Sequence, residues 1–199
     1  MPISRALAAA GIVLLAACAQ EPVTREAPTS ITLTDGLVVS GAPGWCVDAA
    51  STQTADDATV VIFGSCAALN SDARQPRPSV PGIVSVSIEA MSVGAPPVEV
   101  VDEFLLSDAG QAALSRDGSA DTVDILETEI SDETLVLHAV DRSGLATNAS
   151  AEYWRALFDI NGRGVTVSLV GIESNVGAQE DWRAALDAQV ARLKAVNEV

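Results

Sequence analysis

Gly44-Trp45-Cys46-Val47-Asp48 and Ile62-Phe63-Gly64-Ser65-Cys66 are the two stretches that decide the fold of this chain. Each places a cysteine beside a short apolar run, and the two cysteines are 20 positions apart. Short apolar runs bounded by turn residues are typical of β-strands. If the two sulfurs are joined, two strands are held side by side and the rest of the domain can be built around them.

The composition supports one packed domain with an acidic surface. The chain has 199 residues, of which 48% are hydrophobic and 4% aromatic, so aliphatic side chains must fill most of a single core. The larger anchors expected in that core are Trp45, Trp154, Trp182, Phe63, Phe104 and Phe158. Acidic residues number 27 and basic residues 11, which gives a net charge of −16. Such a surface repels phosphate backbones and excludes nucleic acid as a partner.

The first 18 residues carry the pattern of an export signal. One basic residue, Arg5, precedes an uncharged stretch over 6–17, which is too short to cross a bilayer as a helix. Leu15-Ala16-Ala17-Cys18 resembles the lipobox of bacterial lipoproteins. The resemblance implies cleavage before Cys18 and attachment of a diacylglycerol to its thiol, so that lipid anchors the protein to the membrane. The alternatives are an ordinary secretory signal cut at a neighbouring alanine and an uncleaved anchor.

The residues that follow Cys18 set the expected location and domain boundaries. Ala19 stands where an aspartate commonly retains lipoproteins of this family at the inner membrane. The resemblance therefore implies the outer membrane, with the domain on its periplasmic side. Residues 18–30 hold two prolines and are interpreted as the lipidated cysteine and a tether, after a signal peptide at 1–17. Residues 31–199 are expected to form a single domain.

Lipidation of Cys18 would leave two thiols, those of Cys46 and Cys66, in an oxidising compartment. An even count there favours a disulfide. A redox pair or a metal site is the alternative, but the sequence has no Cys-x-x-Cys spacing and only one histidine to complete a zinc site. Closing a loop of about 20 residues is expected to contribute about 3 kcal/mol on the chain-entropy estimate. We therefore predict a structural disulfide.

Alternating apolar residues and turn signals predict an antiparallel sheet. Asp35-Gly36, Ser131-Asp132-Glu133 and Asn161-Gly162-Arg163-Gly164 each separate two apolar runs. The expected strands are 31–33, 37–39, 45–49, 59–66, 83–90, 123–130, 134–141, 151–160 and 165–172. Residues 60–63 are apolar at every position, which predicts a strand covered on both faces. A helix over 152–159 is the alternative to the strand in that region.

Helical periodicity occurs in two regions. Apolar spacing over 98–115, weakened at Ser107 and Gly110, predicts one broken helix or two short ones. Residues 180–197 are expected to form an amphipathic helix with one apolar stripe of Trp182, Leu186, Val190 and Leu193. Antiparallel strands with segregated helices place the fold in the α+β class, as an antiparallel sheet covered by helices.

Two resemblances concern the domain itself. The stretches 42–48, Phe63-Gly64-Ser65-Cys66 and Leu114-Ser115-Arg116-Asp117-Gly118 resemble a small family of alphaproteobacterial lipoproteins, which has no assigned activity. The order of elements also resembles the PsbP-like fold, an antiparallel sheet covered by helices. That second resemblance implies a role in binding or assembly by fold analogy alone.

Few residues are candidates for catalysis or metal binding. A Ser/His/Asp triad would have to use His138, the one histidine, with Asp141 or Asp124, and no Gly-x-Ser-x-Gly motif marks a nucleophile. Asp117, Asp121 and Asp124 gather carboxylates within eight residues, but their spacing differs from that of an EF-hand. A solvated turn is the simpler interpretation.

The sequence therefore predicts a non-enzymatic binding or accessory module of the cell envelope, with no cofactor and no metal site. Its expected partners are the membrane, through the lipid on Cys18, and an envelope protein or ligand of unknown identity. The alternatives are an envelope hydrolase that uses His138 and a lipoprotein that binds a small molecule in a pocket between sheet and helices.

Overall fold

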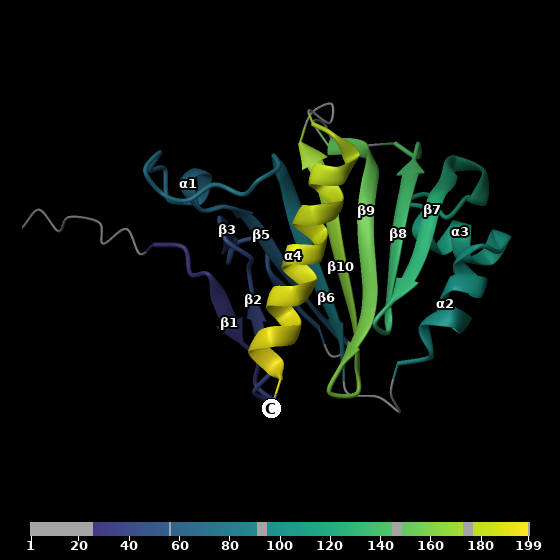
Figure 1. Cartoon of the computed structure of the whole chain (residues 1–199), viewed down its shortest axis with the longest axis horizontal. Helices are drawn as coiled ribbons and strands as arrows, with labels where there is room; N and C mark the ends of the chain where they lie inside the picture. The colour runs from purple at the N-terminus through teal and green to yellow at the C-terminus, as the bar shows by residue number, and fades with distance from the viewer. Residues whose placement is uncertain (1–25, 56, 91–94, 145–148, 173–176, 199) are drawn as a thin grey trace, which may run out of the picture.

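The computed structural model describes residues 26–55, 57–90, 95–144, 149–172 and 177–198, and within these ranges an antiparallel sheet of eight strands forms the centre of the domain (Figure 1). The strands follow the spatial order β3-β5-β6-β10-β9-β8-β7, and β4 pairs with β5. Their bounds are β3 Trp45–Val47, β4 Gln53–Thr54, β5 Ala58–Ser65, β6 Gly82–Glu89, β7 Val123–Ser131, β8 Thr134–Asp141, β9 Ala149–Ile160 and β10 Arg163–Ile172. A separate hairpin consists of β1 (Ser30–Thr32) and β2 (Val38–Ser40).

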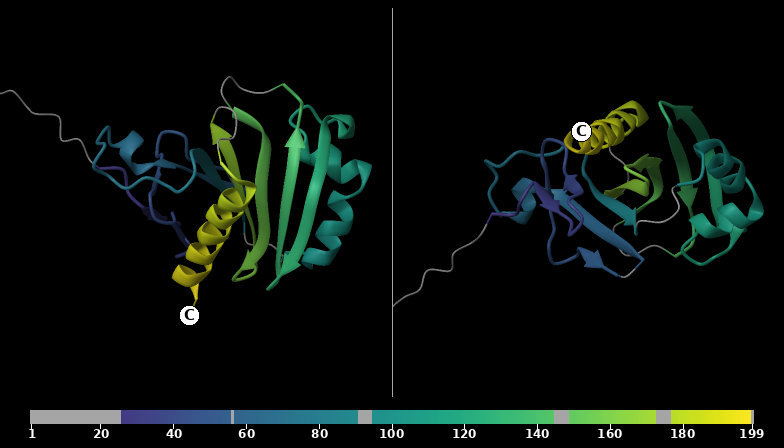
Figure 2. Two further views of the ribbon diagram at one scale, coloured as in Figure 1. Left: turned by 45° about the horizontal axis from the view of Figure 1, so that its top comes forward. Right: turned by 90° about the horizontal axis from the view of Figure 1, so that it is seen from below.

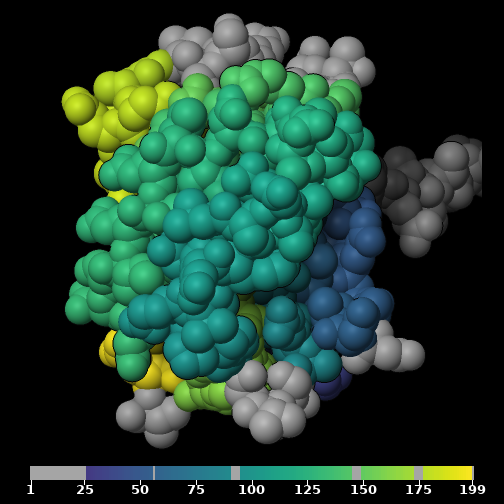
Figure 3. All heavy atoms as spheres, turned by 90° about the vertical axis from the view of Figure 1, so that its right-hand side faces the viewer, coloured from purple at the N-terminus to yellow at the C-terminus, as the bar shows by residue number. Residues whose placement is uncertain are grey.

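Helices lie on both faces of the sheet (Figure 2). On one face, α4 (Gln179–Asn197) contacts β9, β10 and the hairpin strand β2. On the other face, α2 (Val98–Leu105) and α3 (Asp108–Leu114) contact β7 and β8 and form the surface layer there (Figure 3). The short helix α1 (Cys66–Leu69) and the 3₁₀ turn η1 (Ala120–Thr122) complete the helices of the described ranges. The predicted α+β class, antiparallel sheet and C-terminal amphipathic helix are confirmed.

The main core lies between the sheet and α4. Alternate residues of β6, β9 and β10 point into it, as a half-buried antiparallel strand requires. The predicted stripe of α4 is buried in this core: Trp182, Leu186, Val190 and Leu193. A smaller cluster on the other face joins Leu135, Leu137 and Tyr153 to α2 and α3. Phe104 was expected as a core anchor, and this prediction is wrong because its side chain lies on the outer side of α2 and is 49% exposed.

Two tight turns set the register of the central hairpins. Asn161 and Gly162 have φ values of 54° and 79°, and Asp132 and Glu133 have 48° and 56°. Two successive residues with positive φ match the twist of the flanking strands. The turn before β10 is shorter than predicted, because β10 already begins at Arg163. The helical alternative for 152–159 is wrong, since β9 runs as one strand of 12 residues through this region.

The segment after residue 97 forms two short helices instead of one. Ser107 caps α3, and its hydroxyl oxygen accepts a hydrogen bond from the Gly110 N–H at 3.2 Å. Gly110 lies against the end of α2, where an added Cβ atom would be 2.0 Å from the carbonyl oxygen of Phe104. The capping serine and the small residue together explain why the helix breaks there.

The disulfide between Cys46 and Cys66 is confirmed, with Cα atoms 4.8 Å apart. The predicted strand over 59–66 ends one residue earlier, because Cys66 is the first residue of α1. The bond therefore joins β3 to the beginning of a short helix. Both cysteines are only 3% exposed.

The described chain enters the domain beside α1. The Ala27 N–H donates to Asn70 Oδ1 at 2.7 Å, and the Val47 N–H donates to the Pro28 carbonyl oxygen at 2.7 Å. Backbone contacts to the domain thus begin before residue 31. Cys18 and the signal sequence lie outside the described residues. No described helix has the length and hydrophobicity needed to span a membrane.

Candidate functional site

One face of β5 is open, contrary to the prediction of a strand covered on both faces. Val61 and Phe63 point into the main core and are fully buried. Val60 and Ile62 point the other way and are only half-buried. Within the described ranges, the helices on that face contact β7 and β8 and leave the β5 end of the sheet uncovered. The second apolar face of β5 therefore meets a cavity instead of a helix.

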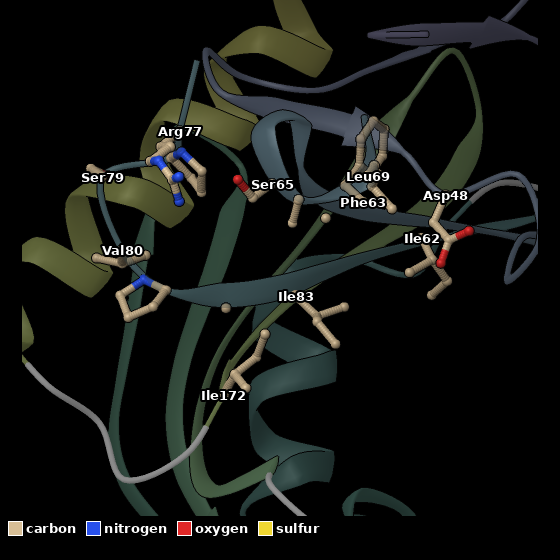
Figure 4. A pocket seen from close by; sticks show the side chains of 15 residues that line it. Asp48, Ile62, Phe63, Ser65, Leu69, Arg77, Ser79, Val80, Ile83 and Ile172 are labelled. Carbon is tan, nitrogen blue, oxygen red and sulfur yellow. The ribbon is translucent and has the colours of Figure 1, made fainter. Parts of the chain in front are cut away.

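The cavity is a half-open pocket of about 420 Å³ (Figure 4). β5, α1, the loop before β6, and the end of β10 surround it. Its apolar lining consists mainly of Ile62, Ala68, Leu69, Pro78, Val80, Pro81, Ile83 and Ile172. Eight large hydrophobic side chains are exposed in the described part of the chain, and three of them line this pocket: Leu69 at 37%, Ile83 at 44% and Ile172 at 44%. Grouped apolar exposure beside a cavity of this size is typical of a ligand site.

Gly44 holds the loop that forms the rim of this pocket. Its φ is +91°, and an added Cβ atom would be 2.3 Å from the carbonyl carbon of Arg77 and 2.4 Å from the nitrogen of Pro78. The Gly44 carbonyl oxygen also accepts the N–H of Cys66 at 2.9 Å. The stretch that carries the disulfide is thus packed against both α1 and the rim.

Gly44→Ala is expected to lower the free energy of unfolding by about 1–3 kcal/mol or more, since a β-carbon makes the backbone conformation costly and collides with the rim. Gly36→Ala is the matched control, because Gly36 has a φ of +90° but no atom within 4 Å of the added carbon. Urea unfolding of both variants separates the two effects. An equal loss in both would show that the close packing on Arg77 contributes nothing.

The polar groups of the pocket differ in how well they are satisfied. Asp48 Oδ1 accepts the N–H of Ala50 at 3.1 Å, and its Oδ2 accepts the hydroxyl of Ser51 at 2.7 Å. Ser65 Oγ is shielded from water and has no hydrogen-bond partner among the described residues. Arg77 is exposed and likewise has no hydrogen bond or ion pair within the described part of the chain. The carboxylate is therefore occupied and the hydroxyl is unpaired but shielded, while the exposed guanidinium of Arg77 is available to a ligand.

His138 belongs to a polar network on the opposite face of the sheet. Its Nε2 lies 2.7 Å from Glu152 Oε1, and its ring stacks on Trp154 with centroids 4.1 Å apart. Trp154 Nε1 donates to Gln179 Oε1 at 3.0 Å, and Gln179 Nε2 donates to Glu152 Oε1 at 2.7 Å. His138 is 8% exposed, and no described serine, threonine or cysteine side chain hydrogen-bonds to its ring. The network ties the beginning of α4 to β8 and β9.

The two aspartates considered as partners of His138 are bound elsewhere. Asp124 forms an ion pair with Arg142. Asp141 is 1% exposed and accepts hydrogen bonds from the Ser143 N–H at 2.9 Å and from the Ser143 hydroxyl. It also lies 3.6 Å from Arg116 Nη1. Burial alone would raise the pKa of Asp141, but these hydrogen bonds and the positive charge outweigh it and lower the pKa below its usual value.

A lowered pKa makes Asp141 a source of stability above its unfolded pKa of about 3.8, and this stability is lost as the pH falls through the folded pKa. Asp141→Asn is expected to reduce stability at pH 7 by about 1–3 kcal/mol. It should also flatten the acid limb of the stability profile below about pH 4. Thermal unfolding from pH 2 to 7, with exposed Asp121→Asn as control, checks both effects. An unchanged acid limb would contradict this assignment.

The acidic stretch near residue 120 forms a turn. Asp117 Oδ1 accepts the hydroxyl of Ser115, the N–H of Ser119 at 2.9 Å and the hydroxyl of Thr122 at 3.1 Å. The Ser115 hydroxyl is the main cause of the lowered pKa of Asp117. Within the described ranges, no three His, Cys, Asp or Glu side chains are grouped as a metal site.

Comparison with known proteins does not assign the chain to a family. No protein-family model matches it, and no curated protein has significant sequence similarity to it.

The sequence patterns did not predict that the residues around β5 and α1 would form a pocket. Ile83 and Ile172 end ordinary alternating strands, and Arg77 lies in a proline-rich loop. The one available signal was the apolar run at 60–63, whose second face needed a partner. A run of this kind does not distinguish a covering helix from a bound ligand.

Proposed function

We propose that this chain is a lipid-anchored binding module of the bacterial cell envelope, and that the pocket between β5, α1 and the loop before β6 takes an apolar ligand. The observation that carries the proposal is the open apolar face of this pocket. Cavities of about 300–1,000 Å³ with mostly apolar walls and few polar groups are typical ligand sites.

The hydrophobic effect supports this use of the pocket. Ile83 and Ile172 are each 44% exposed, and a ligand lying on them would remove apolar surface from water at roughly 25 cal/mol per Å². The pocket is also built on fixed elements, because the disulfide, Gly44 and the sheet hold its walls. When the side chains and loops of a site are ordered before binding, less of the binding free energy is lost in ordering them.

The position of the pocket fits a tethered module. The chain enters the domain at Ala27, which is bonded to Asn70 just after α1. The loop that runs from Asn70 to residue 82 leads into the pocket rim. If Cys18 is lipidated, the pocket lies at the end of the domain to which the membrane tether is attached.

Two further points, the fold family and the location in the cell, are part of the same proposal. We propose a PsbP-like arrangement for the antiparallel sheet and its covering helices, with a binding or assembly role by analogy. We also propose the outer membrane as the location, on the basis of the lipobox and Ala19.

A fluorescence titration with the uncharged probe N-phenyl-1-naphthylamine tests the binding site. The wild-type domain is expected to enhance its emission saturably, and Ile83→Asp should weaken binding at least about tenfold, because a carboxylate would enter the apolar wall. Val100→Asp is the matched control, since Val100 is 55% exposed on α2 and outside the pocket. Equal affinity of Ile83→Asp and wild type would rule out this pocket as the site.

Intact mass of the protein from its native membrane tests the anchor. The expected species begins at Cys18, carries diacylglycerol and amide-linked acyl mass, and gains two alkylated thiols only after reduction. A species that begins at Met1 or Ala19 without acyl mass would contradict the lipid anchor while leaving the pocket untouched.

The second candidate is a hydrolase based on His138. The 2.7 Å contact with Glu152 is the geometry of a general base and its orienting carboxylate. No described hydroxyl or thiol hydrogen-bonds to the ring, so we place this function second. A His138→Ala variant that no longer complements a deletion strain, although it folds and binds the probe, would reverse the order.

A further inference from the structure

Arg77 is distinguished from the other described cations by its lack of a partner. The described ranges contain nine arginine and lysine side chains, and eight of them have a hydrogen bond or an ion pair within those ranges. Arg77 has neither, although the whole chain carries a net charge of −16. Carboxylates greatly outnumber cations in this chain, so most cations find a partner. We therefore interpret the unpaired guanidinium of Arg77 as part of the pocket.

Ser65 contributes a second polar group to the walls of the same pocket. Its hydroxyl oxygen is shielded from water and has no partner among the described residues. In the close view, Ser65 and Arg77 lie toward one end of the pocket, and Ile83 and Ile172 lie toward the other (Figure 4). The pocket therefore has a polar end, where the Arg77 guanidinium can donate hydrogen bonds, and an apolar end.

We infer that the ligand of this pocket is an anionic amphiphile, whose carboxylate or phosphate binds Arg77 and whose alkyl chain lies on Ile83 and Ile172. This inference rests on the proposed function of the pocket. Arginine binds carboxylate and phosphate with paired hydrogen bonds. The carboxylate of Asp48 has acceptors only, but its oxygens are already engaged by Ala50 and Ser51.

A larger cavity of the domain has an acidic lining, with no cation among the described residues that line it. It lies beside α2, has a volume of about 560 Å³ and is lined in part by four acidic residues: Glu89, Glu99, Glu133 and Asp159 (Figure 3). A negative ligand is repelled there and attracted to Arg77, so charge selects between the two cavities.

The anionic group could belong to a free amphiphile or to a bilayer lipid. The net charge of −16 disfavours the approach of the domain to an anionic bilayer, so we assign the site to the free molecule. Vesicles of phosphatidylglycerol serve as the test of this choice.

The experiment compares sodium dodecanoate, below its micelle concentration, with dodecanol as competitors of N-phenyl-1-naphthylamine. Dodecanoate is expected to displace the probe at lower concentration than dodecanol. Arg77→Gln should weaken dodecanoate about tenfold, the loss of one charge-assisted hydrogen bond, and leave dodecanol unchanged. Arg74→Gln is the control with the same charge change, because Arg74 is paired with Asp72 and does not line the pocket.

Each outcome decides one point. Equal displacement by both compounds, with no effect of Arg77→Gln, overturns the anionic assignment and leaves the apolar pocket in place. Failure of the wild type to bind the probe or either compound overturns the proposed function as well. An equal loss of dodecanoate affinity in Arg74→Gln would show that the effect comes from the net charge of the domain. This result would also overturn the role of Arg77. Arg77-dependent sedimentation with the vesicles would overturn the choice of a free amphiphile.

Discussion

Replacing Gln189 with leucine is expected to lower the free energy of unfolding by about 2–6 kcal/mol. Gln189 is fully buried in α4, where its Oε1 accepts the N–H of Ala42 at 2.8 Å and its Nε2 donates to the Ser40 carbonyl oxygen at 2.9 Å. Leucine has a similar volume but satisfies neither group. Ser40 and Ala42 are themselves buried, so each of these backbone groups, left without its partner, would lower the free energy of unfolding by about 1–3 kcal/mol.

Gln111→Leu is the matched control for this variant. Gln111 also lies in a helix, but the one hydrogen bond of its side chain within the described residues, from Nε2 to the carbonyl oxygen of Leu106, is exposed. Its replacement is expected to change stability by no more than about 0.5 kcal/mol. Chemical unfolding of the two variants measures the difference, and equal midpoints would show that the hydrogen bonds of Gln189 add nothing to the stability of the domain.

Removing the disulfide has the second-largest expected effect. Cys46→Ala/Cys66→Ala should lower stability by about 3 kcal/mol, because the unfolded chain regains the freedom of a loop of 20 residues. For a domain of this size the midpoint of thermal unfolding should fall by about 6–12 °C. Binding of the probe should also weaken, since Cys66 begins the helix that places Leu69 in the pocket.

Reduction provides the internal control for this prediction. The reductant should lower the unfolding midpoint of the wild type toward that of the double variant and leave the variant itself unchanged. A double variant with the same midpoint as the oxidised wild type would contradict a stabilising disulfide. A variant with lower stability but unchanged probe affinity would show that α1 keeps its place without the bond.

The parts of the fold that the sequence predicted depend on local patterns. The Asn161-Gly162 turn needs two residues with positive φ, and few residue pairs other than this one tolerate that. The apolar stripe of α4 and the alternation in β6 follow from the periods of helix and strand. The cysteine pair could be predicted because its spacing and its expected compartment agreed.

The parts that the sequence did not predict depend on contacts between distant segments. Gln189 looks like an ordinary polar helix residue until Ser40 of β2, 149 positions away, is placed against it. Phe104 is an apolar residue of α2, but the face of α2 that packs toward the sheet carries Val98, Val101 and Leu105 and leaves Phe104 exposed. The pocket needs the loop around Arg77 to pack on Gly44, and no local pattern encodes that approach.

The most direct test of the central claim, that the pocket on the Cys46–Cys66 stretch is the ligand site, is a methyl NMR titration of isoleucine-labelled protein with 2-naphthol, a small uncharged aromatic probe. Aromatic rings shift the resonances of the methyl groups that they touch. We expect saturable shifts at the isoleucines of the pocket, Ile62, Ile83 and Ile172, and none at Ile125, Ile130 and Ile160. Shifts confined to Ile125 and Ile130, or no shift at Ile83 and Ile172, would contradict it.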